Sequence, residues 1–201
     1  MGMVEKIKFD DCICKTDLDN HHDIKDILLS LIDEAPDVSC AQKDNRCYTH
    51  ISKLDWSDGA NSERPWVEEF YPNFISTLKR ILPEIGYLDL RLHKIWFQQY
   101  LEGDTHGWHI HGDHYTGVYY LEYPDDAAKT QICSPLSMKI HDVDAREGDI
   151  IIFPSHWIHR SGNPNSKSRK TIVSFNLSVE GNALNVVDNP HSNELVHLNK
   201  I

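Results

Sequence analysis

Four histidines and one aspartate lie within the nine residues from His106 to His114, HGWHIHGDH. Side chains at positions i, i+2 and i+4 of a β-strand point to the same side, so an extended segment would present His109, His111 and Asp113 together. Imidazole nitrogens and carboxylate oxygens are common ligands of divalent transition metals. The segment therefore predicts a metal site.

A further ligand must come from elsewhere in the chain, and His159 is suitably placed. In GDIIIFPSHWIHRSG it follows an apolar run and a turn that contains proline, which is typical of a residue near the end of a buried strand. Two histidines and one carboxylate on one side of Fe(II) leave three coordination positions open for a cosubstrate and oxygen. The alternative is a polar loop whose histidines only form hydrogen bonds.

Three motifs in order resemble the H-x-D…H…R set of the Fe(II)- and 2-oxoglutarate-dependent dioxygenases: HGD at 111–113, then His159, then Arg169. The segments GDTHGWHIHGDHYTGVYYLEYP, EGDIIIFPSHWIHRSGNPN and RKTIVSFN are more similar still to 2-oxoglutarate/iron oxygenases of bacteria and phages. Those proteins are similar to prolyl hydroxylases over their catalytic half. The resemblance covers about residues 94–178.

The resemblance implies a fold, an activity and cofactors. The fold would be a double-stranded β-helix, a cupin-like jelly-roll barrel with iron at its mouth. The protein would be an oxidoreductase, a hydroxylase that couples decarboxylation of 2-oxoglutarate to oxidation of a C–H bond. It would use Fe(II) as cofactor, 2-oxoglutarate as cosubstrate and O2. The substrate would be a peptidyl side chain or a small metabolite.

The metal ligands can be assigned in two registers. Counted from Gly103, the family spacing places His109 and His111 at the H-x-D positions, which gives three histidines with His159. A shift by two residues gives His111, Asp113 and His159. We prefer the second set, because a carboxylate offsets part of the 2+ charge. The remaining histidines, His106, His109 and His114, would then surround the ligands or face the substrate.

The resemblance also implies a cation that binds the distal carboxylate of 2-oxoglutarate. Arg169 and Lys170 are neighbours, and strand alternation allows only one of them to face inward. Alternation counted from SFN favours Lys170, whereas the distance from His159 favours Arg169, and on that distance we prefer Arg169. A guanidinium group can also bind a carboxylate in a bidentate way. Tyr120 matches a tyrosine that helps hold this carboxylate in prolyl-hydroxylase-like relatives, with a core aromatic as the alternative. Further pocket walls are expected at Gln98, Tyr100 and Trp108.

A second class is also compatible with the motifs. G-x5-H-x-H, from Gly103 to His111, and G-x5-P…H-x3-N, from Gly148 to Asn163, resemble the two cupin motifs. Cupins share the barrel and often hold metal through three histidines without 2-oxoglutarate. The glutamate expected after His111 is absent, and His156 stands where a cupin would have glycine. A non-catalytic barrel that binds metal or sugar is a third reading. Only the 2-oxoglutarate enzyme requires an inward cation.

The elements that must position these residues follow from hydrophobic periodicity. Residues 1–15 favour an irregular strand, a helix begins at Asp19 or Asn20, a long polar loop covers 36–64, and a second helix covers about 62–82 with a bend at Pro72. After Gly86 short β-rich runs follow. We expect a mainly β single domain, 1–201, with helical support and loops at 1–87, the jelly roll at 88–180 and a polar tail at 181–201.

Composition narrows the setting. The net charge of −11 argues against nucleic acid and anionic membrane as partners. No apolar run is long enough to span a bilayer, and the first residues do not resemble a secretory signal. The five cysteines give no disulfide framework, so we expect a cytoplasmic protein with reduced thiols, and a homo-oligomer is compatible with these features. The cysteines are Cys12, Cys14, Cys40, Cys47 and Cys133.

Overall fold

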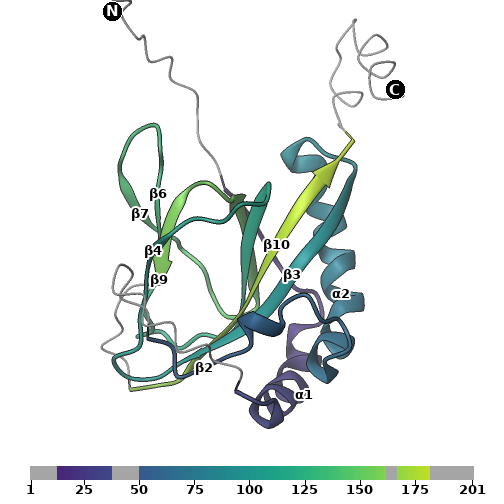
Figure 1. Cartoon of the computed structure of the whole chain (residues 1–201), viewed down its shortest axis with the longest axis vertical. Helices are drawn as coiled ribbons and strands as arrows, with labels where there is room; N and C mark the ends of the chain where they lie inside the picture. The colour runs from purple at the N-terminus through teal and green to yellow at the C-terminus, as the bar shows by residue number, and fades with distance from the viewer. Residues whose placement is uncertain (1–12, 38–49, 162–166, 182–201) are drawn as a thin grey trace, which may run out of the picture.

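The computed structural model describes residues 13–37, 50–161 and 167–181, and it places the helices before most of the strands (Figure 1). The two α-helices are α1 (His21–Glu34) and α2 (Pro65–Ile81), and two short 3-10 helices are η1 (Trp56–Asp58) and η2 (Leu82–Ile85). The strands are β1 (Cys14–Asp17), β2 (Lys53–Leu54), β3 (Asp89–Tyr100), β4 (His106–His109), β5 (Tyr115–Glu122), β6 (Thr130–Cys133), β7 (Ile140–Asp142), β8 (Asp149–Pro154), β9 (Ile158–Ser161) and β10 (Lys170–Glu180).

The strands form two antiparallel sheets. The six-stranded sheet has the order β1-β8-β5-β10-β3-β2, and the four-stranded sheet has the order β4-β9-β6-β7. Consecutive strands of the chain pass from one sheet to the other, for example from β3 to β4 and from β8 to β9. This connectivity encloses the space between the sheets, as the predicted jelly-roll barrel requires.

Helices α1 and α2 cover the outer face of the six-stranded sheet (Figure 1). Proline at the first helical position suits the start of α2, and the helix continues through Pro72, whose side chain is exposed. The apolar side chains of the helices meet alternate residues of β3, β5 and β10, and each large buried side chain contributes about 1.5–3 kcal/mol. This core includes Leu28, Ile32, Phe70, Phe74, Leu78, Phe97, Tyr119, Val173, Phe175 and Leu177.

The loop before α2 is fixed to β3 by one buried carboxylate. Asp55 accepts hydrogen bonds from the Arg64 guanidinium, from Trp66 Nε1 at 3.0 Å and from the backbone N–H of Phe97 at 2.8 Å. A buried carboxylate is stable only when its oxygens are paired in this way. The predicted loop region therefore contributes η1 and β2 to the edge of the sheet. Residues 38–49 of that loop lie outside the described residues.

The opposite face of β10 looks into the barrel. Ile172 belongs to a second apolar cluster, while Ser174 lines a pocket among the histidines, and Asn176 lies beside His111. From Ile172 to Asn176 the inward side chains thus change from apolar to polar toward His111. This order arises from simple alternation, because Val173 and Phe175 point instead into the core under the helices.

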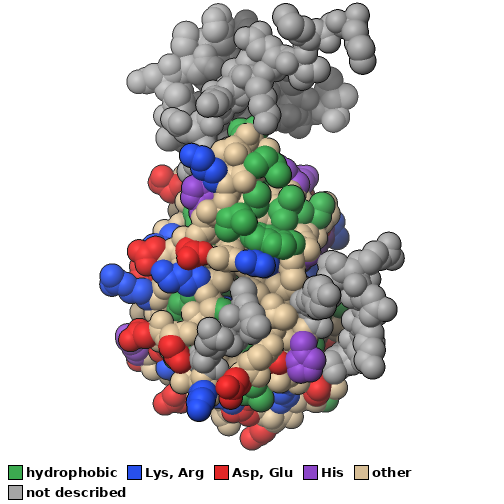
Figure 2. Space-filling model, turned by 90° about the vertical axis from the view of Figure 1, so that its left-hand side faces the viewer, with side chains coloured by type: hydrophobic (Ala, Val, Ile, Leu, Met, Phe, Trp, Pro, Cys, Tyr) green, Lys and Arg blue, Asp and Glu red, His purple; other side chains and the backbone are tan. Residues whose placement is uncertain are grey.

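The outer face of the four-stranded sheet has no helix packed on it in the described part of the chain. Exposed apolar side chains gather on this side of the molecule (Figure 2). They include Ile110, Leu136, Met138, Ile140 and Ile158, each between 37% and 64% exposed. The two sheets therefore differ in how their outer faces are covered.

Some expectations fall outside what the structure describes. The predicted N-terminal strand is described only from residue 13, where β1 begins at Cys14, and the predicted tail is described only at Gly181. Among the described residues, no helix has the length and apolar character needed to cross a membrane.

Candidate functional site

Three histidines from the four-stranded side of the barrel converge on one point. The ligand atoms of His109, His111 and His159 all lie within 4.8 Å of one another. His109 on β4 is the direct cross-strand partner of His159 on β9, and their ring centroids are 4.2 Å apart. His111 follows β4 and is tied to the turn after β8, because its backbone N–H donates to the Ser155 carbonyl at 2.9 Å. This spacing suits three ligands of a single ion.

Hydrogen bonds orient two of these rings. His109 Nδ1 lies 2.8 Å from the Gly107 carbonyl, and His159 Nδ1 lies 2.9 Å from the Trp157 carbonyl. A carbonyl oxygen only accepts, so Nδ1 carries the proton in both rings and Nε2 keeps its lone pair. Metal-binding histidines characteristically donate their second N–H in this way.

Asn176 gives His111 an equivalent partner. Its amide nitrogen lies 3.5 Å from His111 Nδ1, while its amide oxygen is buried without a hydrogen-bond partner among the described residues. Rotation of the amide by 180° exchanges these two atoms and lets the oxygen accept from His111 Nδ1. All three rings can then present Nε2 to an ion.

Burial keeps these histidines neutral. Burial is the main cause of the low pKa of each ring. It lowers the pKa of His111 to about 4 and that of His159 to about 3, and it lowers the pKa of His109 as well. The rings are therefore unprotonated near pH 7, which is the form that binds a metal.

Asp113, the carboxylate of the preferred ligand set, does not join this cluster. The chain bends at residues 112–114, so the alternation assumed for an extended strand ends before Asp113. Its carboxylate lies 3.9 Å from His93 Nε2 instead, and its backbone carbonyl accepts from the Ser155 hydroxyl. Of the two registers derived from the sequence, the structure brings together the one with three histidines.

The other two histidines of the segment behave differently. The His106 ring stacks on the His109 ring at a centroid distance of 3.8 Å, and its Nδ1 lies 3.4 Å from the Gln98 amide nitrogen. His106 therefore lines the pocket beside the cluster. The His114 ring faces away, because its Nδ1 accepts from the backbone N–H of Val179 at 3.2 Å.

Lys170 is the cation that faces the barrel, and Arg169 is not. Lys170 is 2% exposed, its Nζ donates to the Ala128 carbonyl at 2.8 Å and to Ser161 Oγ at 3.1 Å, and no carboxylate pairs with it in the described structure. Arg169 forms ion pairs with Asp33 and Glu122, each at 2.8 Å, on the helix side of the sheet. The preference for Arg169 rested on distance along the chain, whereas alternation along β10 decides which side chain enters the barrel.

Desolvation gives Lys170 an unusual acidity. Burial lowers its pKa from the ordinary 10.5 to about 7. Its Nζ lies 5.2 Å from the Tyr100 ring centroid and 5.3 Å from that of Tyr123. An ammonium group in such surroundings has a strong tendency to pair with an incoming anion.

The aromatic residues expected around the pocket divide into two groups. Tyr120 is buried, but its hydroxyl already donates to Thr130 Oγ1 at 2.8 Å. Gln98 and Tyr100, two of the three expected pocket walls, line the pocket. The Tyr100 hydroxyl is buried without a hydrogen-bond partner among the described residues. Trp108 instead packs against the Arg160 guanidinium at 4.4 Å.

Sequence reasoning missed Trp96 and Asn176. Trp96 lines the pocket, its ring centroid is 5.8 Å from that of His111, and its Nε1 is a second buried donor without a partner in the described structure. Alternation along IWFQQY and along SFN would have placed both residues on the inward face with Gln98 and Ser174. Buried unpaired donors are rare and suggest a polar ligand.

Solved structures of similar fold include several oxygenases. A prolyl-4-hydroxylase of Pseudomonas putida matches with a TM-score of 0.59 and 14% identity, over 85% of this chain and 94% of the other. A prolyl hydroxylase of Trichoplax adhaerens, in complex with a hypoxia-inducible-factor peptide fragment, matches with a TM-score of 0.60 and 15% identity, over 83% of each chain. HygX of Streptomyces hygroscopicus, with nickel, 2-oxoglutarate and hygromycin B bound, matches with a TM-score of 0.60 and 8% identity, over 84% and 83%.

At the level of sequence, no family model and no curated protein matches this chain. Identities of 8–15% carry the fold and not the activity. The chain therefore has the double-stranded β-helix fold that the prolyl hydroxylases and related 2-oxoglutarate- and iron-dependent oxygenases share.

Proposed function

We propose that this protein is an Fe(II)- and 2-oxoglutarate-dependent dioxygenase that hydroxylates its substrate. The observation that carries the proposal is a buried lysine, Lys170, that has no carboxylate partner among the described residues and lies in the same barrel interior as three converging neutral histidines. A metal-binding barrel that does not use 2-oxoglutarate has no need of Lys170, because an unpaired buried ammonium group lowers stability.

His109, His111 and His159 would hold the metal. Imidazole nitrogens suit Fe(II), and the three rings come from one side of the barrel, which leaves the pocket side of an ion accessible. Bound there, Fe(II) would supply the activation of O2 that C–H oxidation requires. The chain's own contribution is to fix the ring orientations through the Gly107 and Trp157 carbonyls.

Lys170 would bind the distal carboxylate of 2-oxoglutarate, with the Tyr100 hydroxyl as a second donor. Both groups are buried. Tyr100, Thr130 and Ser161 line the pocket of the histidines, and Lys170 contacts this lining through its hydrogen bond to Ser161 Oγ. A carboxylate that enters this site exchanges its hydration for a charge-assisted hydrogen bond, and it also relieves the cost of burying the lysine. Trp96 Nε1 remains as a donor close to His111.

The substrate class is less closely defined than the metal and cosubstrate sites. The Trichoplax enzyme is described with a peptide and HygX with hygromycin B, so barrels of this fold accept both polymer segments and small molecules. We propose hydroxylation of a peptidyl side chain or a small molecule, in a reaction that consumes O2 and releases succinate and CO2.

The direct test is to incubate the purified protein with Fe(II), 2-oxoglutarate and O2 and to measure succinate. Slow formation of succinate without added substrate, dependent on both iron and oxygen, is the expected result. Firm binding of Fe(II) without binding or turnover of 2-oxoglutarate would contradict the proposal and favour a cupin-type metal protein.

A further inference from the structure

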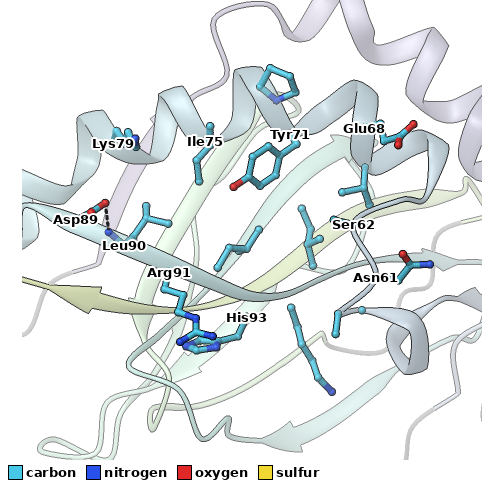
Figure 3. A pocket seen from close by; sticks show the side chains of 17 residues that line it. Asn61, Ser62, Glu68, Tyr71, Ile75, Lys79, Asp89, Leu90, Arg91 and His93 are labelled. Carbon is cyan, nitrogen blue, oxygen red and sulfur yellow. Dashed lines mark hydrogen bonds between the residues drawn. The ribbon is translucent and has the colours of Figure 1, made fainter.

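A large hollow lies away from the barrel interior, between α2 and the first half of β3 (Figure 3). Its volume is about 910 Å³. Tyr71 and Ile75 of α2 point toward the strand, and Leu90 and Leu92 of β3 supply apolar surface on the opposite wall. Tyr71 is 40% exposed although it lies between two elements, so the hollow is open to a ligand.

The strand that forms this wall has an unpaired edge. β10 pairs with β3 along its whole length, but on the other side β2 pairs only with Gln98 and Gln99. Gly59 and Asp55 cover the N–H groups of Ile95 and Phe97. In the described structure no strand pairs with the outer side of residues 89–94, and the Leu90 N–H donates to the neighbouring Asp89 side chain at 2.8 Å. A free strand edge is a template for an added strand.

The hollow is more basic than the molecule as a whole. Lys79, Arg91 and Lys94 line it against Glu68 and Asp89, which gives a local excess of one positive charge. The whole chain carries −11. Such a local reversal of sign favours acidic ligands over basic ones.

The hollow also extends toward the histidine cluster. Lys94, at one end of it, is the cross-strand partner of Asn176, which lies beside His111. A chain that follows the edge of β3 toward Lys94 therefore approaches the mouth of the barrel.

We propose that an extended acidic segment of a polypeptide substrate docks in this hollow as an added strand along residues 89–94 of β3. Residues 89–94 correspond to about 20 Å of extended chain. Only a polypeptide offers alternating N–H and C=O groups to a strand edge, together with side chains for the apolar wall between α2 and β3. That this polypeptide is a substrate rests on the proposed function, whereas its docking does not require iron.

The test uses the metal-free full chain and two fluorescent eight-residue peptides, one alternating glutamate with valine and one alternating lysine with valine. We expect the acidic peptide to bind with an affinity that falls steeply with added salt, and the basic peptide to bind at least about tenfold more weakly. Hydrogen exchange of the backbone amides of residues 89–94 should slow when the acidic peptide is added, which is the signature of strand addition.

Two variants locate the binding surface. The double substitution Lys79→Glu with Arg91→Glu reverses two exposed charges of the hollow and should weaken the acidic peptide at least about tenfold. Ser62→Trp places a large ring in the hollow from an exposed position and should weaken both peptides. The control Lys139→Glu reverses an exposed charge on the β6–β7 connection and should leave binding unchanged.

Three results would overturn the docking proposal. They are equal affinity for the two peptides, an affinity loss in Lys139→Glu as large as in the double variant, and unchanged hydrogen exchange of residues 89–94 when the acidic peptide is added. The outcome is separable from that of the proposed function. If the protein turns over 2-oxoglutarate but binds no acidic peptide, only the docking in the hollow is refuted. If it binds the peptide without any 2-oxoglutarate turnover, only the dioxygenase proposal is refuted.

Discussion

The two sheets of the barrel are built from the same kind of strand but serve different purposes. The six-stranded sheet has helices on its outer face and apolar or polar pocket residues on its inner face, so most residues of β5, β8 and β10 are buried. The four-stranded sheet has short strands and an exposed outer face, yet β4 and β9 carry two of the three converging histidines.

This difference separates stability from chemistry. The long strands are stabilised by the apolar core under α1 and α2, and this core does not contain the site. The short strands lie where a bulge between His106 and His109 and the bend after His111 can aim rings at one point. Lys170 is the exception, because the larger sheet supplies the buried cation opposite the histidines.

The largest expected effect comes from the histidines of the smaller sheet. His109→Ala and His159→Ala should each abolish tight Fe(II) binding, measured by anaerobic titration calorimetry, because two protein ligands remain. Thermal stability should change little without metal, because the large core under α1 and α2 contains neither histidine.

Asp113→Ala is the matched control, and it separates the two ligand registers. It should retain stoichiometric iron, because its carboxylate lies near His93 and outside the histidine cluster. Severe loss of iron affinity in Asp113→Ala with retention in His109→Ala would restore the ligand set first preferred from the sequence.

A methyl group in the larger sheet should act in the opposite way. In Gly117→Ala the new Cβ would overlap the Phe175 ring and the Ile151 carbonyl, so we expect a loss of about 1–3 kcal/mol or more in the free energy of unfolding. Iron binding should survive below the melting temperature. Gly112→Ala is the control, because its Cβ would meet no described atom within 4 Å, and a similar loss there would contradict the comparison.

Lys170 should lower stability in the absence of 2-oxoglutarate. Its folded pKa of about 7 lies below its ordinary 10.5, so the unfolded chain binds more protons between these values and stability rises with pH across that window. Lys170→Met removes this dependence. Relative to the parent, Lys170→Met should raise the free energy of unfolding more at pH 7 than at pH 10, as measured by urea denaturation. The same increase at both pH values would contradict a buried ammonium group.

The smallest effect is expected on the exposed side of the smaller sheet. Ile140 is 56% exposed on edge strand β7, so Ile140→Thr should change the free energy of unfolding by no more than about 0.5 kcal/mol. Ile150→Thr, at a fully buried position of β8, should cost several times more in the same thermal denaturation measurement. Equal losses would mean that the outer face of the smaller sheet is covered.

The fold could be predicted well because its signals are local. Periodicity indicated a helix from Asp19 or Asn20 and another to Leu82, and the structure has α1 and α2 there. The change to alternation after Gly86 indicated the strands. The short β2 and the 3-10 helix η1 gave no such signal, because they depend on the buried Asp55 that ties them to β3.

The site was harder because it depends on where alternation stops. His109, His111 and Asp113 share one face only while the strand continues, and a bend at residues 112–114 cannot be read from hydrophobic pattern. The choice between Arg169 and Lys170 was available from the sequence, since Ser174, Ile172 and Lys170 share one parity on β10. Distance along the chain favours Arg169 and parity favours Lys170, and the structure follows parity.

The central claim is that three histidines and Lys170 together form a site for Fe(II) and 2-oxoglutarate. The most direct measurement is an anaerobic titration of the Fe(II)-loaded protein with 2-oxoglutarate, followed by the visible charge-transfer absorption of the complex. We expect saturable absorption in the parent and in Arg169→Met, and an apparent affinity about a hundredfold or more weaker in Lys170→Met, because a buried carboxylate loses its cation. An unchanged titration in Lys170→Met, or no absorption in the parent, would contradict the account.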